Sequence, residues 1–116
     1  MGKGENLGEL EYLVVIALLR VHQSGEEAYG MAVLRELHET AGRKATIGAV
    51  YGTLDRLEEK GLVGSWKGDP DPVKGGKARR YFRVEPAGYT VLAETRAIMD
   101  RMWNGVVMDP EPESAQ

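Results

Sequence analysis

The densest group of chemically distinctive side chains in this sequence is cationic and lies in the middle of the chain. Residues 43–83 carry ten basic and five acidic side chains, whereas residues 1–42 and 84–116 each have a net charge of −4. A basic segment inside a chain of net charge −3 is expected where one surface meets phosphate groups, although charge also varies along a chain by chance. The basic residues of this cationic segment are Arg43, Lys44, Arg56, Lys60, Lys67, Lys74, Lys77, Arg79, Arg80 and Arg83.

Residues for other kinds of chemistry are scarce. The chain has no cysteine, which excludes disulfides, thiolate zinc sites and cysteine nucleophiles. His22 and His38 are too few and too far apart in the sequence for a histidine metal cluster. The glycines before Lys77 do not make a phosphate-binding loop, because Ala78 follows where such a loop has Ser or Thr. We therefore expect a protein that is not an enzyme and needs no metal or cofactor.

Length and apolar runs limit the architecture. The 116 residues fit one domain that can bury a core without disulfides. The longest apolar run, Tyr12–Leu19, has 8 residues, and a helix needs about 20 to cross a membrane. No signal-peptide pattern is present. We expect a soluble, cytoplasmic protein.

The cationic segment begins beside a predicted helix over residues 46–60. Thr46 is a good N-cap, and Gly61 is a typical stop. Glycine inside a helix costs about 1 kcal/mol relative to alanine, so small residues are expected where a helix must approach another molecule closely. The first turns hold Gly48, Ala49 and Gly52. The predicted buried stripe is Ile47, Val50, Leu54 and Leu57.

A hairpin is predicted after this helix, with strands over residues 62–67 and 78–84. The ten residues between them, 68–77, are rich in glycine and proline and are expected to project as a flexible finger. Alternation places Arg79, Tyr81 and Arg83 on one face of the second strand, and Arg80, Phe82 and Val84 on the other. The cations suited to phosphates or a narrow minor groove are Lys74, Lys77, Arg79 and Arg80.

The first predicted helix, from Leu7, is apolar nearly all round. One face carries Leu10, Leu13, Val14, Ala17, Leu18 and Val21, and the other carries Tyr12, Val15, Ile16 and Leu19. A helix of this kind is buried nearly all round, so we expect a second copy of the chain to cover the second face. The alternative is a central core helix in a monomer.

Two more helices and two tails complete the prediction. One helix runs from Glu27 or Ala28 to Thr40, with Gly42 after its end. The last begins near Pro86 and lies within residues 85–108. Its apolar stripe includes Leu92, Met99, Met102 or Trp103, and Val106. We expect a flexible tail over 1–6, a main domain over 7–84 and a disordered tail over 109–116.

This order of elements predicts a mostly helical winged helix-turn-helix with a small β-hairpin and a C-terminal helix. In such motifs the second helix enters the DNA major groove by its N-terminal end. Two roles stay open: Tyr51 contacts DNA or packs against the preceding helix, and Arg56 reaches DNA or pairs with Glu59 or Glu36. The candidate DNA-binding residues here are Lys44, Thr46, Gly48, Ala49, Tyr51, Gly52 and Arg56.

The same residues resemble a known family. The stretch TIGAVYGTLDRLEEKGL, residues 46–62, resembles the recognition-helix signature S-x-G-T-L-Y-x-x-L-x-R-L-E-x-x-G-L of PadR-like transcriptional regulators. The stretch GGKARRYFRV, residues 75–84, resembles the family's wing G-G-R-x-R-K-Y-Y-R-L. Residues 85–88 resemble its T-x-x-G helix start, with Glu85 in place of Thr. Together with Leu7–Glu11 and the Tyr29-Gly30 pair, the resemblance covers residues 7–103 and fits the short subgroup with one C-terminal dimerisation helix.

The resemblance implies a homodimeric repressor of a palindromic double-stranded operator. The last helix of each subunit would pack against the first and last helices of the other. It also implies a dimer-interface pocket for a small aromatic effector near Met99 and Trp103, unless these are ordinary dimer-core residues. The alternative function is a winged-helix module that binds protein, which would not require cations on the hairpin. The expected dimerisation residues are Tyr12, Val15, Ile16, Leu19, Leu92, Met99 and Met102.

Overall fold

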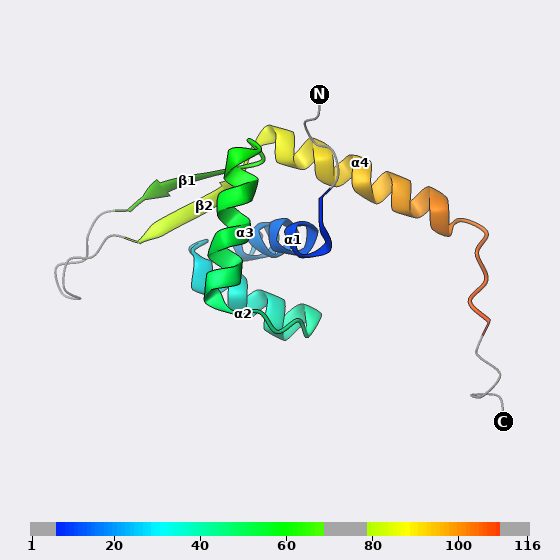
Figure 1. Cartoon of the computed structure of the whole chain (residues 1–116), viewed down its shortest axis with the longest axis horizontal. Coiled ribbons are helices and arrows are strands. Elements are labelled where there is room, and N and C mark those ends of the chain that lie inside the picture. The colour runs from blue at the N-terminus through cyan, green and yellow to red at the C-terminus, as the bar shows by residue number, and fades with distance from the viewer. Residues whose placement is uncertain (1–6, 69–78, 110–116) are drawn as a thin grey trace.

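A computed structural model describes residues 7–68 and 79–109 (Figure 1). Within these ranges the chain is mostly helical with one two-stranded antiparallel hairpin, which confirms the predicted fold class. None of the helices described is long and apolar enough to span a membrane. The elements are α1 (Glu9–Gln23), α2 (Gly30–Ala41), α3 (Ile47–Glu59), β1 (Val63–Lys67), β2 (Arg80–Val84) and α4 (Pro86–Trp103).

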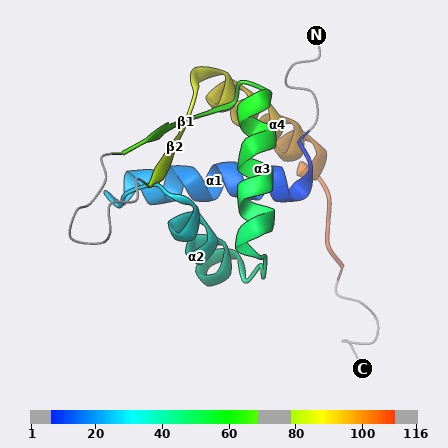
Figure 2. The ribbon, with the colours of Figure 1, turned by 60° about the vertical axis from the view of Figure 1, so that its left-hand side comes forward.

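The core lies where α1, α2 and α3 meet the inner face of the hairpin. α3 crosses α1, and the hairpin leaves this body on one side (Figure 2). Phe82 of β2 is fully buried against the helices, and every member of the core is at most 7% exposed. The largest helical contributors are Val14, Val15, Leu18, Val21, Val33, Leu37, Val50, Leu54 and Leu57.

α3 begins and ends where the sequence predicts. The hydroxyl of Thr46 accepts a hydrogen bond from the backbone N–H of Ala49 at 3.0 Å, as expected of an N-cap. Gly61 has a φ of +80°, which terminates the helix. The predicted stripe is wrong at one position: Ile47 is 36% exposed, because the first residue of α3 lies outside the core.

α2 starts later than predicted because the residues before it are held in an extended conformation. The carbonyl of Ala28 accepts a hydrogen bond from the N–H of Phe82 at 2.8 Å, and Tyr29 forms a β-bridge with Tyr81. The helix therefore begins at Gly30. Its end is as predicted, since Gly42 adopts the left-handed conformation with a φ of 63°.

The strands of the hairpin pair in register, with Val63 opposite Val84 and Trp66 opposite Tyr81. The predicted alternation of β2 is confirmed, because Phe82 is buried while Arg83 points away and is exposed. The predicted finger with Lys74 and Lys77 lies outside the described residues apart from Gly68, as do the two predicted tails apart from Asp109.

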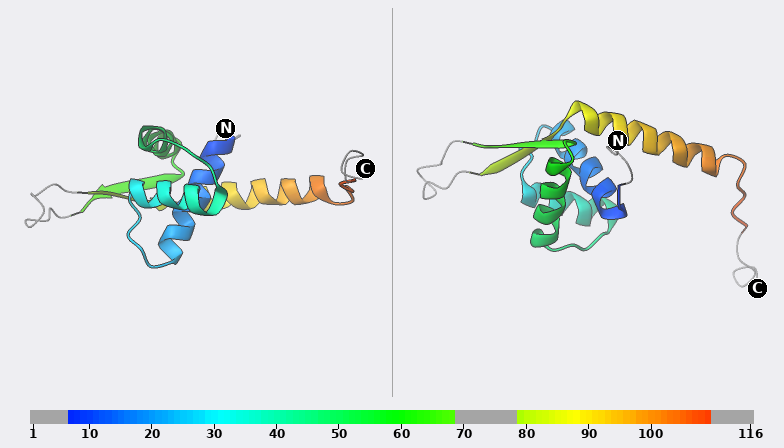
Figure 3. Two further views of the ribbon diagram at one scale, coloured as in Figure 1. Left: turned by 90° about the horizontal axis from the view of Figure 1, so that it is seen from below. Right: turned by 45° about the horizontal axis from the view of Figure 1, so that its top comes forward.

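α4 starts at Pro86 even though Glu85 contributes no side-chain cap. Its first turn lies so close to the end of α3 that a Cβ on Gly88 would be 2.4 Å from the carbonyl oxygen of Leu62. The helix ends at Trp103 rather than near residue 108, since the chain turns at Asn104 and Gly105, where φ is +83°. α4 and the hairpin extend in opposite directions from the three-helix body (Figure 3).

Candidate nucleic-acid interface

The outer face of α3 is open and carries small residues. A Cβ on Gly48 or Gly52 would meet no atom nearer than 3.8 Å, and neither residue has a positive φ. The fold therefore does not require glycine at these two positions. Thr46, Gly48 and Ala49 are exposed at the start of the helix, and Lys44 is exposed just before it.

Tyr51 is half-buried and packs against the preceding helix, as one of its two predicted alternatives states. Its ring lies across Gly30 of α2, where a Cβ would come within 2.4 Å of Cζ. The ring centroids of Tyr51 and Phe82 are 6.1 Å apart. Tyr51 is thus a link between α2, α3 and the hairpin.

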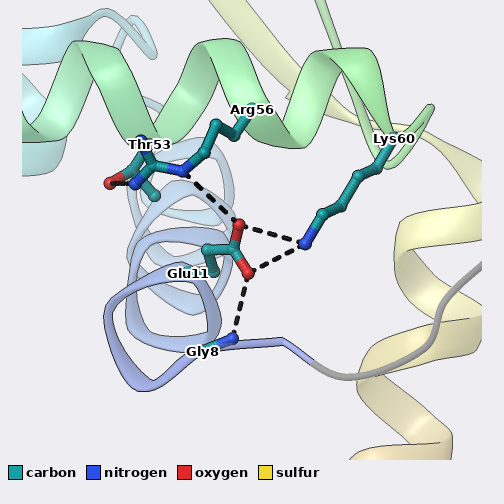
Figure 4. Close-up of polar contacts among 5 residues, drawn as sticks. All are labelled: Gly8, Glu11, Thr53, Arg56 and Lys60. Atoms are coloured by element: carbon teal, nitrogen blue, oxygen red, sulfur yellow. Dashed lines mark hydrogen bonds and ion pairs between the residues drawn. The ribbon is translucent and has the colours of Figure 1, made fainter.

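Arg56 pairs with neither Glu59 nor Glu36, the two partners proposed from the sequence. Its Nη2 donates to the hydroxyl of Thr53 at 3.1 Å, and its Nε lies 3.8 Å from a carboxylate oxygen of Glu11 (Figure 4). Arg56 is therefore drawn toward the N-terminal end of α1.

Glu11 is the centre of this polar cluster and is only 9% exposed. Its carboxylate accepts hydrogen bonds from Lys60 Nζ at 3.0 and 3.1 Å and from the backbone N–H of Gly8 at 2.9 Å (Figure 4). Burial opposes ionisation, but these donors and the nearby Arg56 outweigh it and lower the pKa of Glu11. The cluster fixes the start of α1 to the C-terminal half of α3.

Arg80 is held by the protein at all three of its guanidinium nitrogens. Nη1 lies 2.9 Å from Asp55 and Nη2 lies 2.6 Å from Glu58, both on α3. Nε donates to the hydroxyl of Ser65 on β1 at 3.3 Å. The guanidinium also lies over the ring of Phe82, 4.8 Å from its centroid. The sequence predicts Arg80 as a phosphate contact, whereas its donors here are directed at protein oxygens.

The outer face of the hairpin combines aromatic rings with arginines. Arg79 lies over the ring of Tyr29 at 4.4 Å, and Arg83 lies over Trp66 at 5.6 Å. Tyr81 lies between the two aromatic residues, edge-on to Tyr29 and tilted to Trp66, with centroid distances of 6.4 Å and 5.8 Å. Burial and the adjacent Glu27 carboxylate raise the pKa of Tyr81. Arg79 is exposed at the end of this stack, next to the predicted finger.

A second surface, apolar, lies between α1 and α4. Three of the predicted dimerisation residues of α1 line a groove of about 480 Å³ there, together with Leu92 of α4. The prediction for Val15 is wrong. Its side chain is 1% exposed within the single chain and belongs to the hydrophobic core, so none of it is left for a second copy to cover. The residues that line the groove are Tyr12, Ile16, Leu19, Leu92, Ala93, Arg96, Ala97 and Asp100.

Met99, Met102 and Trp103 do not line this groove. They lie farther along α4 and are 46%, 70% and 52% exposed. Only Gly88 and Val91 of the 18 residues of α4 are buried.

The sequence does not predict several polar partners in this region. They are Asp55, Glu58 and Ser65 around Arg80, and the pair of Glu11 and Lys60. The spacing of Asp55 and Glu58, three residues apart on one helix, could have suggested a joint partner. Their partner comes from another element, so only the register of the hairpin on α3 reveals it.

Comparison with known proteins identifies the family to which this chain is similar. The model of the "Transcriptional regulator PadR-like family" matches residues 18–94. Transcriptional regulator Rv3488 of Mycobacterium tuberculosis is 35% identical over 81 residues, which cover 70% of this chain and 71% of that protein.

Solved structures agree with the sequence match. A PadR family transcriptional regulator from Eggerthella lenta superposes with a TM-score of 0.60 at 30% identity, over 84% of this chain and 81% of that one. A PadR-like transcription factor from Bacteroides fragilis gives a TM-score of 0.67 at 25% identity, over 80% of this chain and 82% of that one. Membership in a family of transcription regulators also supports the prediction that the chain is not an enzyme. This chain, with its three-helix body, hairpin wing and single C-terminal helix, belongs to the PadR-like family of transcriptional regulators.

Proposed function

We propose that the chain is a homodimeric repressor that inserts the N-terminal half of α3 into the major groove of a palindromic operator. The observation that carries this proposal is the open outer face of α3. Gly48 and Gly52 lower the helix propensity by about 1 kcal/mol each relative to alanine, and no contact among the described residues requires them. A duplex that approaches the backbone closely explains both glycines.

Phosphate binding would come from both sides of this helix. Lys44 and Thr46 lie at its N-terminal end, and Arg79 lies on the hairpin beside the predicted finger. Lys74 and Lys77, which the structure does not describe, are proposed as further contacts of the finger. Each phosphate contact releases counterions, so the affinity should fall steeply with salt, by about 0.9 in log–log slope per contact.

The second copy of the chain would cover the apolar surface of α1 and α4. An 18-residue helix with two buried residues has little reason to be stable without a partner. A partner α4 placed along Tyr12, Ile16, Leu19 and Leu92 would bury this face. A two-fold dimer would then present two α3 helices about 34 Å apart, the repeat of one DNA turn.

A gel-shift titration against the DNA upstream of the chain's own gene tests the proposal, with a salt series and a scrambled duplex as control. We expect a dimer by light scattering and specific binding that weakens with salt. In cells, deletion of the gene should raise expression of a reporter fused to that DNA. A chain that stays monomeric, or that ignores duplexes at low salt, would instead be a protein-binding winged helix.

For the effector, we propose that Met99 and Trp103 of two facing α4 helices line a site for a flat aromatic molecule. Both side chains are about half exposed in the single chain, and aromatic and thioether groups suit such ligands. The chain has two tryptophans, so Trp66→Phe leaves Trp103 as the only indole reporter. Quenching of Trp103 by planar aromatics, with release of DNA, supports a pocket; an unchanged spectrum supports a dimer-core role.

A further inference from the structure

We infer that Arg80 is a positioning residue, which locks the hairpin onto α3 so that both DNA-contacting elements move as one body. This inference rests on the proposed DNA binding for its functional consequence, but the locking itself is a property of the free protein.

The geometry around Arg80 leaves little of its guanidinium for DNA. Each of its three nitrogens lies within 3.3 Å of a protein oxygen, on Asp55, Glu58 or Ser65. The hydroxyl of Ser65 in turn donates to Glu58 at 2.8 Å, so the cluster is closed. It joins three elements, namely α3, β1 and β2.

The charge balance also argues against a phosphate at this place. Two carboxylates and one guanidinium leave the cluster with a net charge of −1. Asp55 and Glu58 outweigh the effect of burial and raise the pKa of Arg80, so the cation is a permanent member of the cluster. A phosphate would therefore meet a surface that is anionic overall and where each guanidinium nitrogen already has a protein partner.

Arg79 is the natural contrast, although it is the next residue in the chain. It lies just before β2, over the flat ring of Tyr29, and is exposed. A guanidinium that rests on a ring keeps its N–H groups at the edge, where they can donate to a phosphate. The two neighbouring arginines thus have different tasks, Arg80 toward the protein and Arg79 toward DNA.

Conservative substitutions separate the two tasks. Lysine contacts phosphate well, but its single nitrogen cannot reproduce the planar fork that reaches Asp55, Glu58 and Ser65 from three separate nitrogens. Arg80→Lys should therefore weaken specific binding relative to a scrambled duplex by about tenfold, as loss of net hydrogen bonding to charged groups implies. Arg79→Lys, at the proposed phosphate contact, should change the affinity for the operator and for a scrambled duplex alike. Arg35→Lys, at an exposed arginine of α2 that pairs with Glu26, is the matched control and should stay near wild type. Wild-type affinity for Arg80→Lys, or a salt slope reduced by about 0.9 for Arg80→Met, would make Arg80 a phosphate contact and overturn the inference.

Removal of the two carboxylates is a second test, because the two roles of Arg80 predict different changes in DNA binding. If Arg80 served phosphate, Asp55→Asn with Glu58→Gln would free a cation, remove two negative charges and tighten specific binding. If the cluster positions the hairpin, the same double variant loses specificity, and its preference for the operator over a scrambled duplex falls. Tighter binding to both duplexes with an unchanged preference is the result expected of a sequence-independent phosphate contact, and it would contradict the inference.

A distance measurement on the DNA-free protein tests directly whether Arg80 holds the hairpin in a fixed position on α3. Because the chain has no cysteine, Glu59→Cys on α3 and Lys67→Cys on β1 accept spin labels selectively, and both positions are exposed. The distance distribution should broaden in Arg80→Met and in the double carboxylate variant. An unchanged distribution would refute the locking. If the wild type binds no duplex, the proposed function fails, whereas this measurement still tests the position of the hairpin.

Discussion

Two regions of the molecule differ in the side chains that form them. The junction of α3 with the hairpin is polar and charged, whereas the groove between α1 and α4 is mainly apolar. At the junction, Arg80 is matched by carboxylates and a hydroxyl of the same chain. In the groove, Ile16 and Leu92 line a hollow that no other described part of the chain covers. The junction is complete in the single chain, and the groove is not.

This difference indicates what each surface needs from outside. Charged groups that already satisfy one another gain little from a partner, so the junction can hold a fixed shape before DNA arrives. Apolar side chains in water gain about 25 cal/mol for each Å² that a partner covers. We therefore expect the groove to govern assembly and the junction to govern the accuracy of DNA recognition.

The largest effect should come from a charge in the groove. Ile16→Asp would place a carboxylate in the interface, where burying it unpaired is costly, and the dimer should dissociate. A monomer contacts one half-site, so operator affinity should fall by at least about a hundredfold as the bivalent advantage is lost. Light scattering and gel shifts measure the two effects. Met31→Asp, at an exposed apolar position on α2, is the control for assembly and should leave the dimer intact.

Next in size is the effect of a methyl group added to α2 where this helix faces the inner side of α3. Gly30→Ala would bring a Cβ within 2.4 Å of the Tyr51 ring, which is wedged beside Phe82. Overpacking of this kind costs roughly 1–3 kcal/mol, despite the better helix propensity of alanine. Urea unfolding should show a lower midpoint. A midpoint at or above that of the wild type would mean that Tyr51 can move aside and is no link between the elements.

The same methyl group on the outer side of α3 should do the reverse. Gly52→Ala has space within the protein, so it should stabilise the fold by up to about 1 kcal/mol. The added Cβ would hold the duplex away and weaken operator binding by about tenfold, as for a lost close contact. Unfolding and gel-shift experiments on one sample measure both. Unchanged affinity would remove the main support for close approach at this helix.

The sequence predicts local structure well and pairwise contacts poorly. Thr46, Gly42 and Gly61 define helix ends through their own backbone and side-chain preferences, so these boundaries could be predicted. The start of α2 could not, because the bridge from Tyr29 to Tyr81 depends on residues 52 positions away.

The candidate site also combines local features that the sequence predicts with contacts between elements that it does not. The small residues of α3 are a local pattern and are found open, as the sequence suggests. The partners of Arg80 and Arg56 depend on how the hairpin and α1 lie against α3, which no spacing reveals. Val15 was misassigned because the helical period alone does not show how wide the buried face of α1 is.

The smallest effect concerns the polar cluster at Glu11. This cluster joins α1 to α3 and does not include the hairpin. Because the folded pKa of Glu11 is lowered from its ordinary value near 4.5, its ionised form stabilises the fold. This contribution is present above about pH 4.5 and is lost as the pH falls through the lower folded pKa. Glu11→Gln should cost about 1 kcal/mol at pH 7, since the partners Lys60 and Arg56 are partly exposed.

The pH dependence distinguishes this charge effect from simple packing. The stability difference between the wild type and Glu11→Gln, from urea unfolding, should shrink as the pH drops below 4.5, because protonation gives the wild type the same neutral side chain. Glu39→Gln, at an exposed position on α2, should show a small and nearly constant difference. A difference for Glu11→Gln that persists undiminished in acid would mean that the cluster acts through shape, and that its ion pairs add nothing to the hold of α1 on α3.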